Sequence, residues 1–338
     1  MKEPIRIELP MLQPKMSVNA YLFLDPEPVL IDCGMNTDAT LALLEGELQK
    51  HGLALGDLAH VYITHAHIDH MGMAGRLANK TEAKIWVNPF TLPWTRDLEK
   101  QWQKRAKIIE SALVQEAPPG WDNPVLRGMN GFFKQALACW SEIPAESLNV
   151  YEIGETLSFG GGDWEVLYVP GHSNTQTCFY EKSRQWLFSA DMLLPLTPTP
   201  AIEMKIDEPE EREISIVRLL DSFEQMKNLP LEKVFPGHGE AFSHHKQLID
   251  AQLARIQMRK EECLRVIQRG NTSFFDIFEH IYPGAFNIFT LSMLKGYLDL
   301  LEIEEHIQID TTEGYRKYRA NGTTSQFPIE IQKTTDGL

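Results

Sequence analysis

The sequence has few cysteines, and their spacing suggests no pairing. Four occur in 338 residues, far apart and without a Cys-x-x-Cys pair: Cys33, Cys139, Cys178 and Cys263. A disulfide-stabilised small fold and a zinc ribbon both need closely and regularly spaced cysteines. The sequence disfavours both, and we expect four buried free thiols in a reducing cytoplasm.

Long hydrophobic runs are also missing. The apolar runs Ala20–Leu24 and Val29–Ile31 are interrupted by Asp or Pro well short of the length that spans a bilayer. The opening residues Met1-Lys2-Glu3-Pro4 lack the apolar region of a secretory signal. We therefore expect a cytoplasmic protein with no membrane partner.

Basic residues are outnumbered by acidic ones. The chain has 32 Lys and Arg against 47 Asp and Glu, which gives a net charge of −15. This surplus repels phosphate backbones, so no nucleic-acid partner is expected, although a local basic groove would override that expectation. The length and the 43% hydrophobic content fit one large domain or two ordinary ones.

Strands and helices alternate through most of the chain, which predicts an α/β layered fold. An amphipathic helix is expected over Thr37–His51, and a shorter one between Gly75 and Lys80. The expected strands are bounded by turn residues: Ala20–Leu24, Pro28–Ile31, His60–Thr64, Ala83–Val87, Val150–Ile153, Thr156–Phe159, Trp164–Val169, Thr177–Tyr180 and Trp186–Ser189.

Two regions depart from this alternation. Residues 90–145 carry apolar side chains at helical spacing on both sides of Pro118-Pro119-Gly120, which predicts an inserted helical hairpin. Residues 246–320 predict three helices, Gln247–Arg269, Phe274–Ile281 and Asn287–Leu301, followed by a β-hairpin. That order is typical of a winged-helix domain. We therefore expect a catalytic domain at 1–245, a winged-helix-like domain at 246–320 and a loose tail at 321–338.

The most informative segment is Thr64-His65-Ala66-His67-Ile68-Asp69-His70, directly after a predicted strand. In extended backbone, His65 and His67 point to the same side and can meet one ion. Asp69 and His70 follow where the chain turns into a helix, and they can reach a second ion. Imidazole and carboxylate together suit zinc best, with iron or manganese as alternatives.

Three further single residues complete the set of possible donors. His172 follows Val169-Pro170-Gly171, Asp191 follows Phe188-Ser189-Ala190, and His238 lies in Pro236-Gly237-His238-Gly239. A single His after Pro-Gly is usually only a turn residue. The shared position at the carboxyl ends of strands is what makes these three candidates, because α/β folds gather their sites at that edge.

This order of motifs resembles the metallo-β-lactamase superfamily, and Asp191 with the His238 motif resembles its glyoxalase II-like hydrolase branch. The resemblance covers roughly residues 15–245 and implies a four-layer αββα sandwich with a dinuclear metal site. It implies that one metal is held by His65, His67 and His172. It implies that the other is held by Asp69, His70 and His238, with Asp191 bridging both. Asp32, in Leu30-Ile31-Asp32-Cys33-Gly34, matches a strand-end Asp of the family that supports a ligand histidine without contacting the metal. The alternative interpretation is an exposed turn residue.

Two positions depart from the family's pattern. Met73 stands where the family commonly has the second glycine of Asp-His-x-Gly-Gly, and Thr175 stands where it often keeps a glycine after the third histidine. Neither is a predicted ligand. Both could alter the pocket wall or a close backbone approach that glycine permits.

The predicted chemistry is hydrolysis of a small acyl substrate. Two divalent ions would lower the pKa of a bridging water to about 7, so that a hydroxide attacks a carbonyl of a thioester, lactone or other ester. Asp69 could also orient that nucleophile. Two alternatives stay open: a metal-dependent phosphodiesterase or nuclease, and a sulfur dioxygenase with one iron.

Aromatic residues of the insertion could line an acyl pocket or lid, although helical periodicity favours packing on the body for most of them: Trp94, Trp102, Trp121, Phe132, Phe133 and Trp140. The winged-helix-like region offers little to nucleic acid. Its third helix has Lys295 against Asp299, and only Arg316, Lys317 and Arg319 on the hairpin are basic. We expect this region to pack on the hydrolase body or to build a homodimer.

Overall fold

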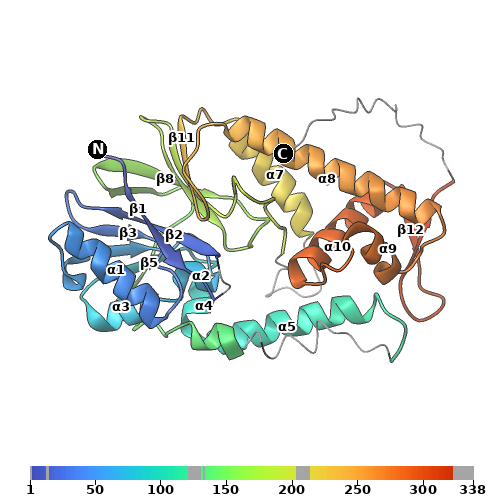
Figure 1. Cartoon of the computed structure of the whole chain (residues 1–338), viewed down its shortest axis with the longest axis horizontal. Coiled ribbons are helices and arrows are strands. Elements are labelled where there is room, and N and C mark those ends of the chain that lie inside the picture. The colour runs from blue at the N-terminus through green and yellow to red at the C-terminus, as the bar shows by residue number, and fades with distance from the viewer. Residues whose placement is uncertain (1, 13–14, 121–130, 132–133, 203–213, 323–338) are drawn as a thin grey trace.

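Two β-sheets lie face to face between outer layers of helices (Figure 1). The computed structural model describes residues 2–12, 15–120, 131, 134–202 and 214–322. The predicted four-layer αββα fold is confirmed, because hydrophobic cores fill the space between the sheets and cover the outer face of each sheet.

The first sheet has six strands in sequence order. β1, β2 and β3 pair antiparallel, and β3 to β6 pair parallel. The strands are β1 (Ile5–Pro10), β2 (Ser17–Phe23), β3 (Val29–Ile31), β4 (His60–Tyr62), β5 (Lys84–Val87) and β6 (Leu148–Val150). The parallel strands β3 and β4 end at the same edge, where the histidine segment follows β4.

The second sheet has five strands in the order β11-β10-β9-β8-β7, and only β10 and β11 run parallel. They are β7 (Thr156–Phe159), β8 (Gly162–Tyr168), β9 (Thr177–Glu181), β10 (Trp186–Ala190) and β11 (Lys233–Pro236). In β8, Trp164 and Val166 are buried while Asp163 and Glu165 are not, the alternation of a strand with one inward face.

Aromatic rings fill the space between the sheets. Phe159 stacks on Trp164 with ring centroids 5.2 Å apart, and Tyr62 stacks on Trp86 at 5.7 Å. Phe188 of the second sheet contacts Tyr21 and Phe23 of the first. The first two contacts each join rings of a single sheet, whereas those of Phe188 hold the two sheets together.

Helices cover the outer face of the first sheet. They are α1 (Asp38–Lys50), the 3₁₀ turn η1 (Leu55–Asp57), α2 (Ile68–Met71) and α3 (Ala74–Lys80). The Thr37 hydroxyl accepts a hydrogen bond from the Thr40 amide at 3.1 Å and so starts α1. Of the insertion, the structure describes α4 (Leu92–Arg96), α5 (Leu98–Val114) and helical residues 134–138, whereas residues 126–130 and 132–133 of the predicted second helix lie outside the described residues.

The helices beyond the second sheet are α7 (Ser215–Lys227), α8 (His245–Gln268), α9 (Phe274–Ile281) and α10 (Ile288–Ile303). Helix α10 packs on α7 and α8, and α9 packs on α8 and α10. The hairpin β12 (Ile307–Asp310) and β13 (Lys317–Ala320) follows. One hydrophobic core includes side chains of β10, α7, α8, α10 and β13. The region 246–320 therefore packs on the catalytic body, which is one of the two arrangements expected from the sequence. Its winged-helix assignment and the domain boundary at 245 stay predictions.

The sequence prediction missed three elements and placed several bounds a few residues away. It assigned no element to β1, β11 or α7. β11 has only Val234 and Phe235 between Lys233 and Pro236, a run too short to stand out as a strand. The predicted free thiols are confirmed, since all four cysteines are buried and unpaired by disulfides.

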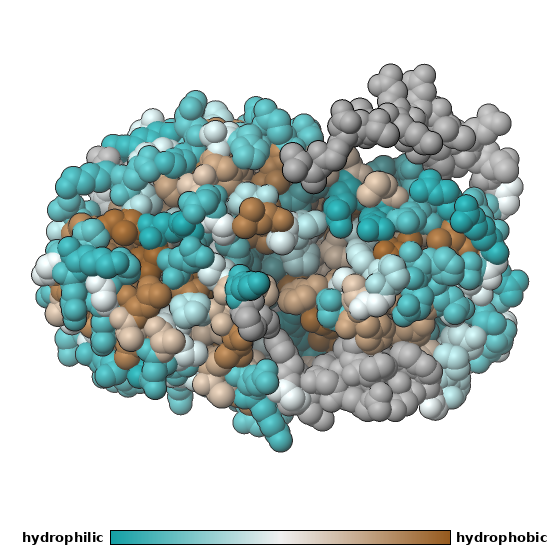
Figure 2. Space-filling view, in the orientation of Figure 1, coloured by the Kyte–Doolittle hydropathy of each residue, from teal (hydrophilic) through white to brown (hydrophobic). Residues whose placement is uncertain are grey.

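The face seen in Figure 2 is mainly hydrophilic, and its hydrophobic residues lie in small separate groups. No helix within the described residues is long and apolar enough to cross a membrane.

Candidate metal centre

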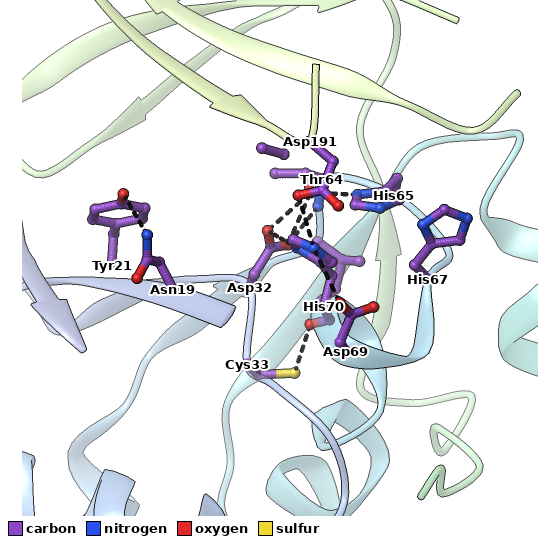
Figure 3. A network of polar contacts seen from close by, with 12 residues as sticks. Asn19, Tyr21, Asp32, Cys33, Thr64, His65, His67, Asp69, His70 and Asp191 are labelled. Atoms are coloured by element: carbon purple, nitrogen blue, oxygen red, sulfur yellow. Dashed lines mark hydrogen bonds and ion pairs between the residues drawn. The ribbon is translucent and has the colours of Figure 1, made fainter. Parts of the chain in front are cut away.

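All seven predicted ligands meet at one edge of the sandwich. They form two groups whose donor atoms lie within 4.8 Å of one another: His65, His67, His172 and Asp191 in the first, and Asp69, His70 and His238 in the second. Figure 3 shows Asp191 reaching from the second sheet towards histidines carried by the first. The strand-end positions in the sequence therefore do converge in space.

The first group combines both sheets. His65 and His67 follow β4, and His172 follows β8. The Nε2 atom of His172 lies 3.0 Å from Nδ1 of His67, so two ring nitrogens face each other. His65 is fully buried, and its Nε2 atom has no hydrogen-bond partner among the described residues.

The second group starts at the first turn of α2. Asp69 and His70 lie in that turn, and His238 follows β11. His238 Nε2 lies 3.5 Å from Oδ2 of Asp69. His70 is fully buried, and its Nε2 atom also lacks a hydrogen-bond partner among the residues described.

Asp191 lies between the two groups. Its Oδ2 atom is 3.3 Å from Nε2 of His172 and 3.3 Å from Nε2 of His238, whereas Oδ1 is 3.2 Å from Nε2 of His70. One carboxylate thus contacts histidines of both groups. This placement is the one that the resemblance implies for a bridging ligand.

The opposite ring nitrogens of four histidines are anchored to the protein. His70 Nδ1 lies 2.7 Å from Oδ2 of Asp32, and His65 Nδ1 lies 3.0 Å from the Thr64 hydroxyl. His172 Nδ1 donates to the Pro200 carbonyl at 3.0 Å, and His238 Nδ1 donates to the Ser17 carbonyl at 2.5 Å. A hydrogen bond on the far nitrogen fixes the ring's orientation and leaves the near nitrogen free for a metal.

Asp32 is buried, so the exposed-turn interpretation is wrong. It is 3% exposed, and besides His70 it accepts hydrogen bonds from the amide and hydroxyl of Thr64 at 2.9 Å each. Its backbone φ of +57° is left-handed, a conformation that needs support from its surroundings. Asp32 therefore holds both His70 and the residue before His65.

Asp191 is aimed at the site by an irregular strand end. The pairing of β10 with β11 shifts register between Phe188 and Ala190, and Ala190 has a φ of +42°. Bulges of this kind redirect the following side chain. Gly237 faces the same point, and a Cβ there would lie 2.2 Å from Oδ1 of Asp191. The site requires glycine at 237 because no side chain fits.

Charge in the cluster is distributed between carboxylates and imidazoles. Burial disfavours charge on His70, but Asp191, Asp32 and Asp69 outweigh it and hold the pKa of His70 well above its usual range. For His238, Asp191 likewise outweighs burial and raises the pKa to about 10. Burial, assisted by the neighbouring imidazoles of His70 and His67, holds the pKa of His65 well below its usual range.

The carboxylates respond in the opposite direction. Burial favours the neutral form of Asp69, but the His70 and His238 imidazoles outweigh it and lower its pKa to about 2. The pKa of Asp191 is held well below its usual range against burial by His238 and His70. The Nε2 protons of charged His70 and His238 must leave before these rings can bind a metal, whereas the Nδ1 protons stay in their hydrogen bonds.

The donor set fits divalent metal ions. Three buried atoms that face this cluster lack hydrogen-bond partners within the described residues, namely Nε2 of His65, Nε2 of His70 and Oδ1 of Asp191. Among the described residues, Asp32, Asp69 and Asp191 form ion pairs with histidines and not with Lys or Arg. A bound cation would satisfy these atoms and offset the carboxylates.

Sequence reasoning missed several residues that shape the site. The Thr64 hydroxyl connects Asp32 with His65, and the carbonyls of Ser17 and Pro200 orient His238 and His172. Backbone carbonyls carry no residue-specific signal, so no motif could have indicated them. Thr64 adjoins the histidine motif, and that position was the only available clue.

Comparison with known proteins agrees with this geometry. The sequence matches the metallo-beta-lactamase superfamily over residues 14–238, well over half of the chain, and the protein belongs to that superfamily. A probable metallo-hydrolase of Bacillus subtilis, YqjP, is 26% identical over 303 residues, which are 86% of this chain and 89% of that protein. The chain is a metal-dependent hydrolase of this superfamily.

A second relative is the human acyl-coenzyme A thioesterase MBLAC2. It is 26% identical over 234 residues, which are 64% of this chain and 70% of that protein. Among solved structures, the metallo-beta-lactamase family protein TTHA1429 from Thermus thermophilus aligns with a TM-score of 0.78 at 19% identity. That match covers 95% of this chain and 99% of the other, so the fold extends through the C-terminal helices.

Proposed function

We propose that the protein is a dinuclear metal-dependent hydrolase that cleaves a small acyl substrate, with a thioester as the first choice and a lactone or other ester as the next. The observation that carries this proposal is the position of Asp191 between two complete groups of donor atoms. A site for one ion would need only one of these groups. Zinc suits five imidazoles and two carboxylates best, with iron or manganese as alternatives.

Two ions bound here would supply hydroxide at neutral pH and would stabilise negative charge on a reacting carbonyl or leaving group. The residues of the chain provide the rest. His65, His67 and His172 would hold one ion, Asp69, His70 and His238 the other, and Asp191 both. Asp69 would also accept a hydrogen bond from the nucleophile and orient it. Because His67 and His238 are partly exposed, substrate would approach from their side.

The thioester preference is supported by the thioesterase relative and not by the aromatic residues of the insertion. Trp94 is 4% exposed within the core under the first sheet, and Trp102 and Trp140 pack against the same core. These three therefore pack on the body instead of lining a pocket. Trp121, Phe132 and Phe133 lie outside the described residues.

Assignment to the glyoxalase II-like branch is part of the proposal. It is supported by Asp191 between the two groups and by the Gly237-His238-Gly239 loop, in which Gly237 leaves room for Asp191. A cytoplasmic location and a homodimer stay predictions.

The alternative phosphodiesterase activity is disfavoured by the C-terminal region. The basic side chains of its third helix and its hairpin lie beside carboxylates: Lys295 with Asp299, Arg316 with Glu116, Lys317 with Glu313, and Arg319 with Asp310. Together with the net charge of −15, this leaves little positive surface for phosphate backbones, and no nucleic-acid partner is proposed.

The test is a substrate panel on protein loaded with zinc or iron. Acyl thioesters, lactones and bis-p-nitrophenyl phosphate are assayed in parallel, together with oxygen uptake. We expect thioester cleavage to be the fastest reaction and to vanish in a His65→Ala/His67→Ala double variant. Faster phosphodiester cleavage, or oxygen uptake with one iron per chain, would overturn the proposal.

A further inference from the structure

Thr175 is the position at which the sequence departs from the glycine of its family, and the structure shows what its side chain contacts. It lies between His172 and β9, and it is 1% exposed. Its hydroxyl accepts a hydrogen bond from the Ala66 amide at 2.9 Å. Ala66 is the residue between His65 and His67, so this bond joins the two histidine-bearing segments of the first donor group.

Further hydrogen bonds extend the same connection between the sheets. The Asn88 side chain donates to the Thr175 carbonyl at 2.8 Å and to the Thr64 carbonyl at 3.4 Å. The amide and hydroxyl of Thr177 both donate to the Thr64 carbonyl, at 3.0 and 2.7 Å. Among these contacts, the bond from Ala66 to Thr175 is the one that reaches between the two ligand histidines.

The side chain of Thr175 is itself held in place. Its hydroxyl lies 2.9 Å from the Ser173 hydroxyl, which also accepts from the Thr175 amide at 3.2 Å. A glycine at 175 would remove this acceptor and leave the Ala66 amide without it in the buried interior. An unpartnered buried amide is costly, so the local backbone would shift to find another partner.

We propose that Thr175 is a positioning residue for the first metal: it fixes the backbone between His65 and His67 against the loop that carries His172. This inference rests on the proposed function, since it assumes that this group binds a metal. Thr175 does not contact the ion. It acts by setting the spacing of three ligands, His65, His67 and His172, that come from two different sheets. The described contacts of Thr175 do not connect it to Asp69, His70 or His238 of the second group.

The test compares metal affinity in two backgrounds that separate the groups. In a His238→Ala background only the first group keeps all of its donors, and in a His67→Ala background only the second does. Thr175→Val removes the hydroxyl at nearly constant volume. We expect Thr175→Val to weaken zinc binding by about 10- to 100-fold in the first background. In the second background it should change binding by no more than about twofold, because none of the contacts described for Thr175 reaches Asp69, His70 or His238.

Two variants complete the design. Thr175→Ser keeps the hydroxyl and should restore the affinity of the first group to within about twofold. Thr95→Val is a matched control, because Thr95 is fully buried and its hydroxyl donates only to the Leu92 carbonyl in α4, at 2.8 Å. It should leave both affinities unchanged. If Thr175→Val does not fold, Thr175→Gly takes its place with the same expected loss.

The outcomes separate the inference from the proposed function. Unchanged zinc binding by the first group in Thr175→Val, or equal losses in Thr95→Val, would overturn the role of Thr175. Failure of the unmodified chain to bind zinc, iron or manganese would overturn the proposed function itself. A loss in Thr175→Val that Thr175→Ser does not restore would also overturn the role of the hydrogen bond, because the methyl group would then be what matters.

Discussion

Two buried polar clusters in this molecule have opposite character. The metal centre gathers imidazoles and carboxylates, and within the described residues its carboxylates form ion pairs only with histidines. The second cluster lies where α5 meets the C-terminal region and consists of two carboxylates, two cations and a phenol. We call it the ion cluster: Glu116, Lys295, Asp299, Arg316 and Tyr318.

The ion cluster supplies its own counter-charges. Glu116 is 1% exposed and accepts a hydrogen bond from the Tyr318 hydroxyl at 2.6 Å. Its other oxygen lies 3.4 Å from the Lys295 ammonium and 3.6 Å from the Arg316 guanidinium. Asp299 accepts from Lys295 at 2.7 Å. Two negative and two positive side chains are therefore matched.

The difference indicates which buried cluster needs a ligand. Around Asp191 the carboxylates form ion pairs only with histidines among the described residues, an arrangement that fits a bound cation. Around Glu116 the charges are already balanced, and the cluster is a structural connection between the insertion and the C-terminal helices. Figure 1 shows α5 running from α4 towards those helices. Changes in the first cluster should act on metal and rate, and changes in the second on stability.

The largest effect is expected from Asp191→Asn. Because Asp191 contacts histidines of both groups, losing its charge should lower metal content at both and reduce hydrolysis by about 1,000-fold or more. The measurement is zinc per chain together with the turnover of the best panel substrate. Asp163→Asn, an exposed change in β8, is the control and should leave both unchanged. Retention of two zinc ions and full rate in Asp191→Asn would contradict the bridging role.

Glu116→Gln should have the next largest effect, and only on stability. Removing one charge of a buried ion pair leaves its partners uncompensated and costs about 3 kcal/mol. Denaturant unfolding measures this loss, and zinc affinity should not change. Glu313→Gln serves as control, since Glu313 is half exposed in its pair with Lys317 and should cost less than about 1 kcal/mol. Equal losses of stability in Glu116→Gln and Glu313→Gln would contradict the distinction between the buried ion cluster and an exposed ion pair.

Asp32→Asn should act on the metal centre more weakly than loss of a ligand. The amide keeps the size of the side chain but loses the charge that orients His70 and holds Thr64. Mutation of a supporting residue of this kind lowers metal affinity or rate by about 10- to 100-fold. A competition titration with a zinc-binding dye measures the affinity. A loss as large as that of Asp191→Asn would instead make Asp32 a ligand.

Tyr318→Phe is the smallest change. It removes one buried hydrogen bond to Glu116 while Lys295 and Arg316 still face that carboxylate, so the cost should be about 1 kcal/mol. Thermal unfolding of the metal-free protein measures it. A loss as large as that of Glu116→Gln would show that the phenol and not the charges holds the ion cluster together.

The metal centre was predictable because its signal is local. His65, His67, Asp69 and His70 stand within one short segment, and His172, Asp191 and His238 each follow a strand that ends at the same edge. Most strands and helices followed from the alternation of strands with helices and from apolar residues at helical spacing. Short elements such as β11 were missed because two apolar residues make no pattern.

The contacts between distant segments were not predictable. Glu116 and Tyr318 are 202 positions apart, and neither belongs to a motif. Thr175 could be recognised only as a departure from a family pattern, since its partner Ala66 is 109 positions away. A sequence states which residue types are present, but pairing of side chains across the chain depends on how the sheets and helices pack.

The most direct test of the central claim is an anomalous diffraction measurement at the zinc edge on crystals of the zinc-loaded, unmodified chain. We expect two peaks, one among His65, His67 and His172 and one among Asp69, His70 and His238, with Asp191 between them. A single peak, or zinc bound only outside these residues, would contradict the central claim.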